Sequence, residues 1–199
     1  MKTGWKRKLP HSREIYYFDS GDAFEVDVCA RILHGMIKDT INEKRKKGVV
    51  FLCIGTDRST GDSLGPLIGY KLKEQRIRRA RIVGTLERPV HAMNLEQSVA
   101  MVRRQYPNHV IVAVDASVGR LDHVGYITMG KGALRPGLGV RKELQEVGDI
   151  FITGIVGSCG NYDPLMLQSV RLAVVMQMAD RICESIFLVE QFWENAASF

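Results

Sequence analysis

The sequence contains no long apolar run, and no stretch approaches the roughly 20 residues that a membrane-spanning helix needs. The basic N-terminal segment MKTGWKRKLPHSREIYYF also lacks the apolar core of a secretory signal. Both absences argue against a membrane or exported protein, so we expect the chain to be cytoplasmic and to make no membrane contact.

Cysteine is scarce, with four residues in 199, and no two of them form a CxxC pair or a zinc-like spacing with histidine. Cys29, Cys53 and Cys183 lie within apolar patterns, where a free cysteine behaves as a small buried hydrophobic residue. A disulfide framework is therefore not expected.

Nucleotide-binding and serine-hydrolase motifs are missing as well. No GxGxxG fingerprint follows the apolar run at 49–54, so a Rossmann cofactor is not supported. The segment GYITMGKG at 125–132 approaches the phosphate-loop pattern but ends in Gly132, which has no hydroxyl for magnesium. Ser158 has Val156 where a nucleophile elbow needs glycine. We expect no cofactor.

The chain does contain a regular alternation of strand-like and helix-like patterns. Apolar runs predict strands at 49–54, 80–85, 110–117, 125–130 and 149–157, and amphipathic periods predict helices at 22–47, 64–75, 95–106 and 164–192. This alternation predicts an α/β fold, a three-layer α/β/α sandwich with a mostly parallel central sheet. Residues 1–21 look irregular and basic, and 22–199 read as one domain.

The formal net charge is +6, with basic runs at 44–47 and 76–81. Such runs attract nucleic acid or acidic surfaces, but solvated helix ends account for them too. We interpret them as solvated helix ends, so no direct nucleic-acid binding is expected.

Acidic residues gather where the predicted parallel strands end. Asp57 and Asp62 lie in the loop GTDRSTGDSLGP after the first strand, and Asp115 ends the apolar run VIVAVD. The carboxyl ends of parallel strands share one edge of a sheet, where open α/β proteins place their chemistry. A carboxylate such as Asp115 is costly to bury unless it is paired, hydrogen-bonded or coordinated.

The residues alone leave several roles open for these groups. Asp62 could be the N-cap of the following helix, and Asp115 could brace the loop after its strand. If the two carboxylates converge, they can share a proton and activate water. They can also bind a divalent cation, with Asp57 as a third ligand.

The third strand exit, GSCGNYDP, supplies further candidates. Ser158, Cys159 and Asn161 are placed to contact or support a substrate, and a Cys159 nucleophile would need a nearby base. Glu87, just past the second strand, is a possible third carboxylate of the site, and His123 enters the site if its loop folds toward Asp115.

Four segments carry a resemblance to a known family: GTDRSTGDSLGP, VIVAVDASVG, GALRPGLGVRKEL and ITGIVGS, in this order. Together they resemble the YyaC-type sporulation proteins, which look like smaller relatives of the germination protease. That protease degrades small acid-soluble spore proteins. The layout is more distantly similar to the hydrogenase-maturation endopeptidases, which implies a phosphorylase/hydrolase-like α/β/α fold.

The resemblance implies an aspartic-type endopeptidase of the forespore or spore core that acts on a protein or peptide, small acid-soluble spore proteins among the candidates. Asp62 in DSLGP and Asp115 in VDA match the two catalytic aspartates of the protease. Asp57 stands where the protease has asparagine. The segment GSCGNYD lacks the histidine that the maturation endopeptidases use for nickel, so no metal of that kind is expected. The alternatives are an inactive peptidase-like binding protein and a divalent-metal-binding variant. The sequence does not predict the oligomeric state.

Overall fold

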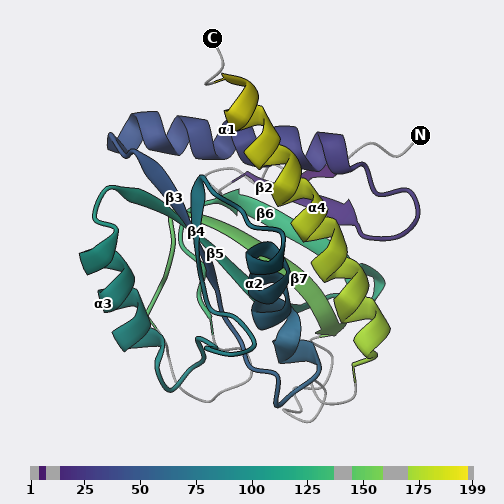
Figure 1. The fold of residues 1–199 in the computed structure, drawn as a ribbon. Helices are drawn as coiled ribbons and strands as arrows, with labels where there is room; N and C mark the ends of the chain where they lie inside the picture. Colours follow the sequence, from purple (N-terminus) through teal and green to yellow (C-terminus); the bar gives the residue numbers. More distant parts are fainter. Residues whose placement is uncertain (1–4, 8–13, 137–144, 159–169, 197–199) are drawn as a thin grey trace.

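The structure, a computed structural model, describes residues 5–7, 14–136, 145–158 and 170–196 (Figure 1). Its strands are β1 Trp5–Arg7, β2 Ile15–Asp19, β3 Gly48–Cys53, β4 Ala80–Val83, β5 His109–Gly119, β6 Tyr126–Lys131 and β7 Ile150–Ser158. Its α-helices are α1 Val26–Lys44, α2 Leu64–Glu74, α3 Leu95–Gln105 and α4 Leu172–Ala196, and short 3₁₀ turns span Gly61–Ser63 (η1) and Leu121–His123 (η2).

All seven strands belong to one sheet in the order β1-β2-β6-β7-β5-β3-β4. The strands β4, β3, β5 and β7 run parallel, as expected for strands joined by helical crossovers. The remaining three strands extend the sheet through antiparallel pairs. The fold is therefore α/β with a mixed sheet flanked by helices, and the predicted fold class is confirmed.

Helices cover the two faces of the sheet unequally. On one face α1, α2 and α4 pack against alternate strand residues such as Phe51, Val112 and Ile152. On the other face α3 packs against Val50 and Ile111, which point the opposite way because side chains alternate along a strand. Within the described residues no helix of this second face extends over β6 and β7, whose side chains there include polar ones. This leaves an open region of the sheet beside the carboxyl end of β5.

Two features at the ends of the chain differ from the prediction. The segment 1–21, predicted to be irregular, contains β1 and β2, and Phe18 of β2 is buried in the core. The predicted start of the last helix at Pro164 lies outside the described residues, and α4 begins at Leu172. The predicted short helix after the glycine-rich loop falls largely on 137–144, also outside them.

The three cysteines that the structure describes are free and buried. Burial raises the pKa of Cys29 and of Cys183 to about 12, which keeps both thiols protonated. Their predicted role as small hydrophobic residues is confirmed. None of the helices in the described ranges is long and apolar enough to cross a membrane.

A buried carboxylate ties α4 to the edge of the sheet. Glu190 of α4 is 5% exposed, and its Oε1 accepts the backbone N–H groups of Arg78 at 2.7 Å and Arg79 at 2.8 Å. These donors lie just before β4, which has no partner strand on its outer side to satisfy them. Glu190 therefore fixes the path of the chain into β4.

Replacing Glu190 should separate this hydrogen-bonding role from simple packing. Glu190→Ala leaves two N–H groups without their acceptor and should lower the free energy of unfolding by about 1–3 kcal/mol. Glu190→Gln keeps an amide oxygen at the same position and should cost less. Urea unfolding measures both variants, and equal losses would contradict the assigned role.

Candidate active site

The loop between β3 and α2 closes tightly over the end of the sheet. The Ile54 N–H donates to the Val114 carbonyl at 2.7 Å, and the Thr56 N–H donates to the Asp62 carbonyl at 3.1 Å. A Cβ on Gly55, whose φ is +137°, would collide with the Asp62 carbonyl, and one on Gly65 would collide with the Ile54 carbonyl. The two glycines therefore allow the loop to bring Asp62 back toward β5.

Asp115 lies on β5 one residue past the last pair with β3, opposite Thr153 of β7, and is 5% exposed. Its Oδ1 accepts the Ala116 N–H at 2.8 Å. Burial, and then the negative charge of Asp62, raise the pKa of Asp115 well above its ordinary value, although the Ala116 N–H acts in the opposite direction. Of the two carboxyl groups, Asp115 is therefore the one whose protonated form is favoured more strongly.

Asp62 lies in η1 and is half-buried. Burial raises its pKa, while the Thr56 N–H and the charge of His91 favour its ionised form. The capping alternative for Asp62 is not supported, because the N-cap of α2 is Ser63 and no side chain caps it. The structure therefore brings Asp62 and Asp115 into one electrostatically coupled pair at the predicted edge of the sheet.

His91 is a further group of the site, and its charge acts to lower the pKa of Asp62. Its loop is held against the end of β3, since Val90 pairs with Ile54 and accepts the Gly55 N–H at 2.7 Å. The His91 N–H donates to Asn94 Oδ1 at 2.8 Å, and Nδ1 accepts the Met93 N–H at 3.3 Å. The feature of the sequence that could have indicated His91 is its position after a predicted parallel strand.

A row of hydroxyl groups continues from Asp115 across the open part of the sheet. Thr153 of β7 is the register partner of Asp115, and Thr128 of β6 is the partner of Thr153. The two threonine Oγ1 atoms lie 2.6 Å apart, and Ser117 Oγ donates to Thr153 Oγ1 at 3.2 Å. Sequence reasoning missed this row, because it depends on the register of three strands.

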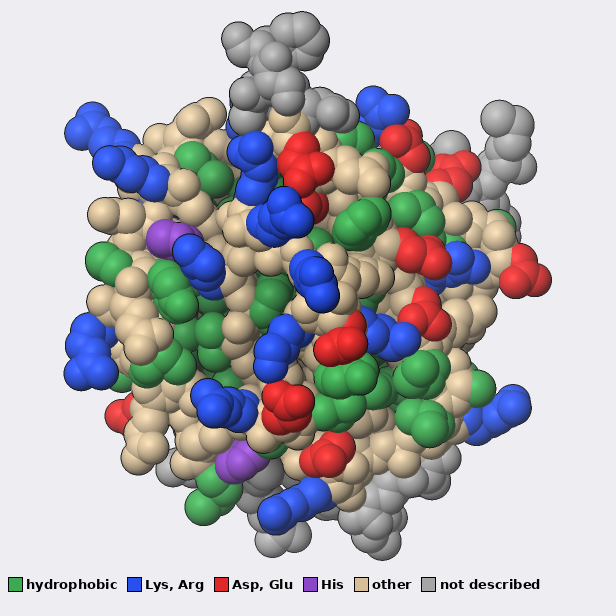
Figure 2. Space-filling view, viewed as in Figure 1, with side chains coloured by type: hydrophobic (Ala, Val, Ile, Leu, Met, Phe, Trp, Pro, Cys, Tyr) green, Lys and Arg blue, Asp and Glu red, His purple; other side chains and the backbone are tan. Residues whose placement is uncertain are grey.

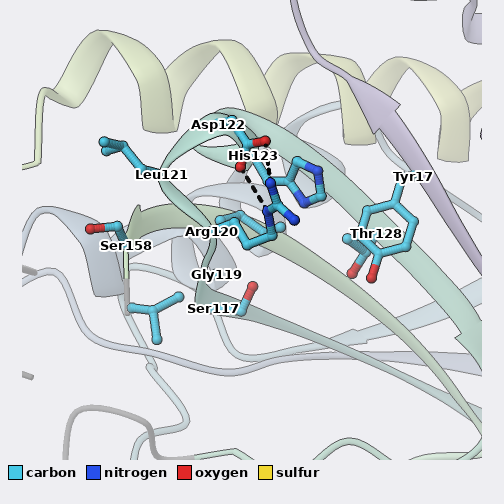
Figure 3. Close-up of a pocket in the computed structure, with 11 residues that line it drawn as sticks. Tyr17, Ser117, Gly119, Arg120, Leu121, Asp122, His123, Thr128 and Ser158 are labelled. Carbon is cyan, nitrogen blue, oxygen red and sulfur yellow. Dashed lines mark hydrogen bonds and ion pairs between the residues drawn. The ribbon is translucent and has the colours of Figure 1, made fainter. Parts of the chain in front are cut away.

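A cavity of about 840 Å³ lies over this row (Figure 3). The register of β5 and β7 shifts after Ser117, because Val156 of β7 has no partner on β5, and the cavity is lined by Ser117, Val118 and Gly119 at this point. In Figure 3 Tyr17 and His123 lie on one side and Ser158 and Leu121 toward the other. Its lining residues are Tyr17, Ser117, Val118, Gly119, Arg120, Leu121, Asp122, His123, Thr128, Ile155 and Ser158.

The lining of this cavity is mixed in character. Arg120 and Asp122 neutralise each other through hydrogen bonds of 3.0 and 2.9 Å, so they add little net charge. The Tyr17 and His123 rings lie 5.6 Å apart. Of the residues considered for the site from the sequence, Ser158 and His123 both line this cavity.

Other predicted site residues lie elsewhere. Asp57 is exposed in the turn before η1, and Glu87 is exposed and pairs with Lys73 at 3.1 Å. Neither contributes to the electrostatic shifts of the Asp62–Asp115 pair. Cys159 and Asn161 lie outside the described residues.

The described side chains of the site do not form the three-ligand group that a bound metal needs. Among the described residues, no three His, Cys, Asp or Glu side chains form a group able to hold a metal ion. Asp57, Asp62 and Asp115 therefore do not make the three-carboxylate site that the sequence left open.

Comparison with known proteins identifies the family and supports the fold. The chain belongs to the family described as "Protein of unknown function (DUF1256)", which matches residues 22–185. It is 42% identical over 162 residues to "Uncharacterized protein YyaC" of Bacillus subtilis, covering 81% of this chain and 79% of that protein. The fold is similar to the crystal structure of the NiFe hydrogenase maturation protease HycI from Thermococcus kodakarensis, with a TM-score of 0.51 and 18% identity over 80% of this chain and 99% of that one.

Because Asp115 is buried, replacing its carboxyl group with a neutral amide should change the stability of the protein by an amount that depends on pH. The folded-state pKa lies above the unfolded value, so the folded protein loses stability as pH rises from about 4 through the folded pKa. Asp115→Asn should therefore raise the free energy of unfolding by about 1–2 kcal/mol near pH 8 and by less near pH 4. Urea unfolding at both pH values tests this, and a gain that does not depend on pH would contradict the assigned ionisation.

Proposed function

We propose that this protein is a peptidase that hydrolyses a peptide bond with an aspartic dyad, Asp62 and Asp115. The observation that carries the proposal is the coupled pair of carboxylates at the carboxyl end of a parallel sheet, each with a raised pKa. When two carboxyl groups lie in environments that give them different pKa values, one can act as an acid and the other as a base at the same pH. The fold similarity to a maturation protease is consistent with this chemistry.

Burial and neighbouring groups assign the two roles. Asp115 is the more deeply buried and carries the proton, so it donates a hydrogen bond to the scissile carbonyl oxygen. Asp62 is half-exposed and is favoured as a carboxylate by the Thr56 N–H and by His91, so it accepts a proton from the attacking water. The water adds to the carbonyl carbon, and the amine leaves with a proton returned from the dyad.

The cavity beside the dyad is where a substrate peptide would lie. The cavity lies along the row of hydroxyl groups that starts next to Asp115, and Ser117 and Thr128 belong to both the row and the cavity lining. Hydroxyl groups at its floor can hydrogen-bond a peptide backbone, while Val118, Leu121 and Ile155 offer apolar contacts to side chains. This lining fits an extended segment of polypeptide better than a small charged molecule.

The family resemblance suggests where such a peptidase works. The motifs around Asp62 and Asp115 are similar to those of the germination protease, so small acid-soluble spore proteins are the first substrates to test. On this proposal the protein acts in the forespore or spore core. Tight association without turnover would instead support a peptidase-like binding protein of the sporulation programme.

The dyad is tested by incubating small acid-soluble spore proteins with purified enzyme and following the products by mass spectrometry. Wild type should give discrete fragments, and Asp62→Asn and Asp115→Asn should each lower the rate at least about a hundredfold, since each removes an acid–base group. Asp27→Asn is the matched control, because Asp27 is exposed on α1 and pairs only with Arg31. An Asp115→Asn protein that cleaves at the wild-type rate would rule out the mechanism.

The pH dependence of cleavage tests the assignment of the proton. Activity requires one proton on the pair, so kcat/KM should fall as pH drops and Asp62 becomes protonated. It should also fall as pH rises through the raised pKa of Asp115, by about tenfold per unit beyond that point. A rate that stays level far into the alkaline range would show that no protonated carboxyl group is needed.

A further inference from the structure

The fold collects three basic segments that are far apart in the sequence. Because the connecting helices run antiparallel to the strands, the ends of α1, α2 and α3 lie at the amino ends of β3, β4 and β5, which are adjacent in the sheet. We call this surface the basic edge. Its residues are Lys46, Lys47, Arg76, Arg78, Arg79, Arg81, Arg103 and Arg104.

The positive charges of the basic edge are not neutralised. All of these side chains except Lys46 are exposed, and within the described part of the chain none of the eight forms an ion pair. Acidic groups nearby include Glu74 at the end of α2, the buried Glu190, and Asp149, which accepts the Ile111 N–H and pairs with Lys44. In Figure 2, Lys and Arg side chains gather at the upper left, where β3 begins and α3 ends in Figure 1.

Several contacts hold the basic edge in a fixed arrangement. Glu190 accepts the backbone N–H groups of Arg78 and Arg79, which leaves both guanidinium groups free to project. Lys46 Nζ donates to the Pro107 carbonyl at 2.7 Å, linking the start of β3 to the start of β5. Burial, and then the charges of Arg81 and Lys46, lower the pKa of His109, so these two charges act on a common region. A surface held in this way loses little conformational entropy on binding.

From this arrangement we infer that the basic edge binds the phosphate backbone of a nucleic acid. Six of its eight cations are arginines, whose planar forks match phosphate oxygens. The starts of three neighbouring strands span about 10 Å, and the ends of the helices on both faces widen the surface. Duplex DNA carries one charge per about 1.7 Å of axis, so several phosphates can be contacted at once. This revises the expectation, drawn from separate basic runs, that no nucleic acid is bound.

The basic edge is independent of the proposed peptidase site. The dyad lies at the carboxyl ends of the parallel strands and the basic edge at their amino ends, so the length of the sheet separates them. A nucleic acid on the basic edge therefore leaves the cavity in Figure 3 open. Failure of cleavage assays would not affect this inference, and failure of nucleic-acid binding would not affect the dyad.

Fluorescence anisotropy with a labelled duplex of about 20 base pairs tests the inference in the full-length protein. Wild type should bind duplex DNA with an affinity that falls steeply between about 50 and 200 mM salt. The triple variant Arg78→Ala/Arg79→Ala/Arg81→Ala keeps the backbone N–H groups that bind Glu190. It should weaken DNA binding at least about tenfold, and the slope of log K against log salt concentration should become shallower by about 2 to 3. Matched RNA duplex and single-stranded probes identify the preferred nucleic acid.

The matched control removes the same charge from another surface. Arg31→Ala/Lys38→Ala/Lys131→Ala also lowers the net charge by three, but these cations lie on α1 and β6. This variant should change affinity less than about threefold. Urea unfolding checks that each triple variant folds, and Arg81→Ala alone replaces the first triple if it does not. Absence of salt-dependent binding, equal losses in both triples, or tighter binding of poly-glutamate than of DNA would overturn the inference.

Discussion

The desolvation of the Asp115 carboxyl group is the constraint on which the site depends. A charged carboxylate in the middle of a sheet would lower the stability of the fold, whereas a protonated one is tolerated and can donate a hydrogen bond. The packing around the strand end imposes this state, because β7 pairs with Asp115 on one side and the β3 pairing ends at Val114 just before it on the other. Asp62 adds a second negative group nearby and reinforces the protonation of its partner. Core packing thus determines the acid–base character of the pair.

The parallel part of the sheet also separates charge along its length. The loop after β3 and the carboxyl half of β5 carry the dyad, and the residues around the starts of β3, β4 and β5 carry arginines and lysines that form no ion pair within the described residues. Each helical crossover returns the chain from one end of the sheet to the other, so neighbouring loops in space come from distant parts of the sequence. The face beside β6 and β7 adds a cavity at the end of the sheet that carries the dyad.

Much of this arrangement could be predicted from the sequence. The apolar runs of β3, β5 and β7 identify strands buried on both faces, and the shared edge of parallel strands is enough to pair Asp62 with Asp115. The strand β2 was missed because its alternation in IYYFD follows a polar, basic stretch. The hydroxyl row and the basic edge depend on strand register and order, which local patterns do not encode. The position of His91 depends on how its loop docks on β3.

The pairing of β2 with β6 has a consequence for how the chain folds. Ser20, just after β2, donates its hydroxyl proton to the carbonyl of Gly125, 105 residues later in the sequence, at 2.6 Å. During synthesis the first strands therefore leave the ribosome long before their partner exists, while β3, β4 and β5 can already form a parallel nucleus with α2 and α3. The β1–β2 pair must wait for β6 before it can join the sheet, so this earlier part of the chain reaches its final place after later parts.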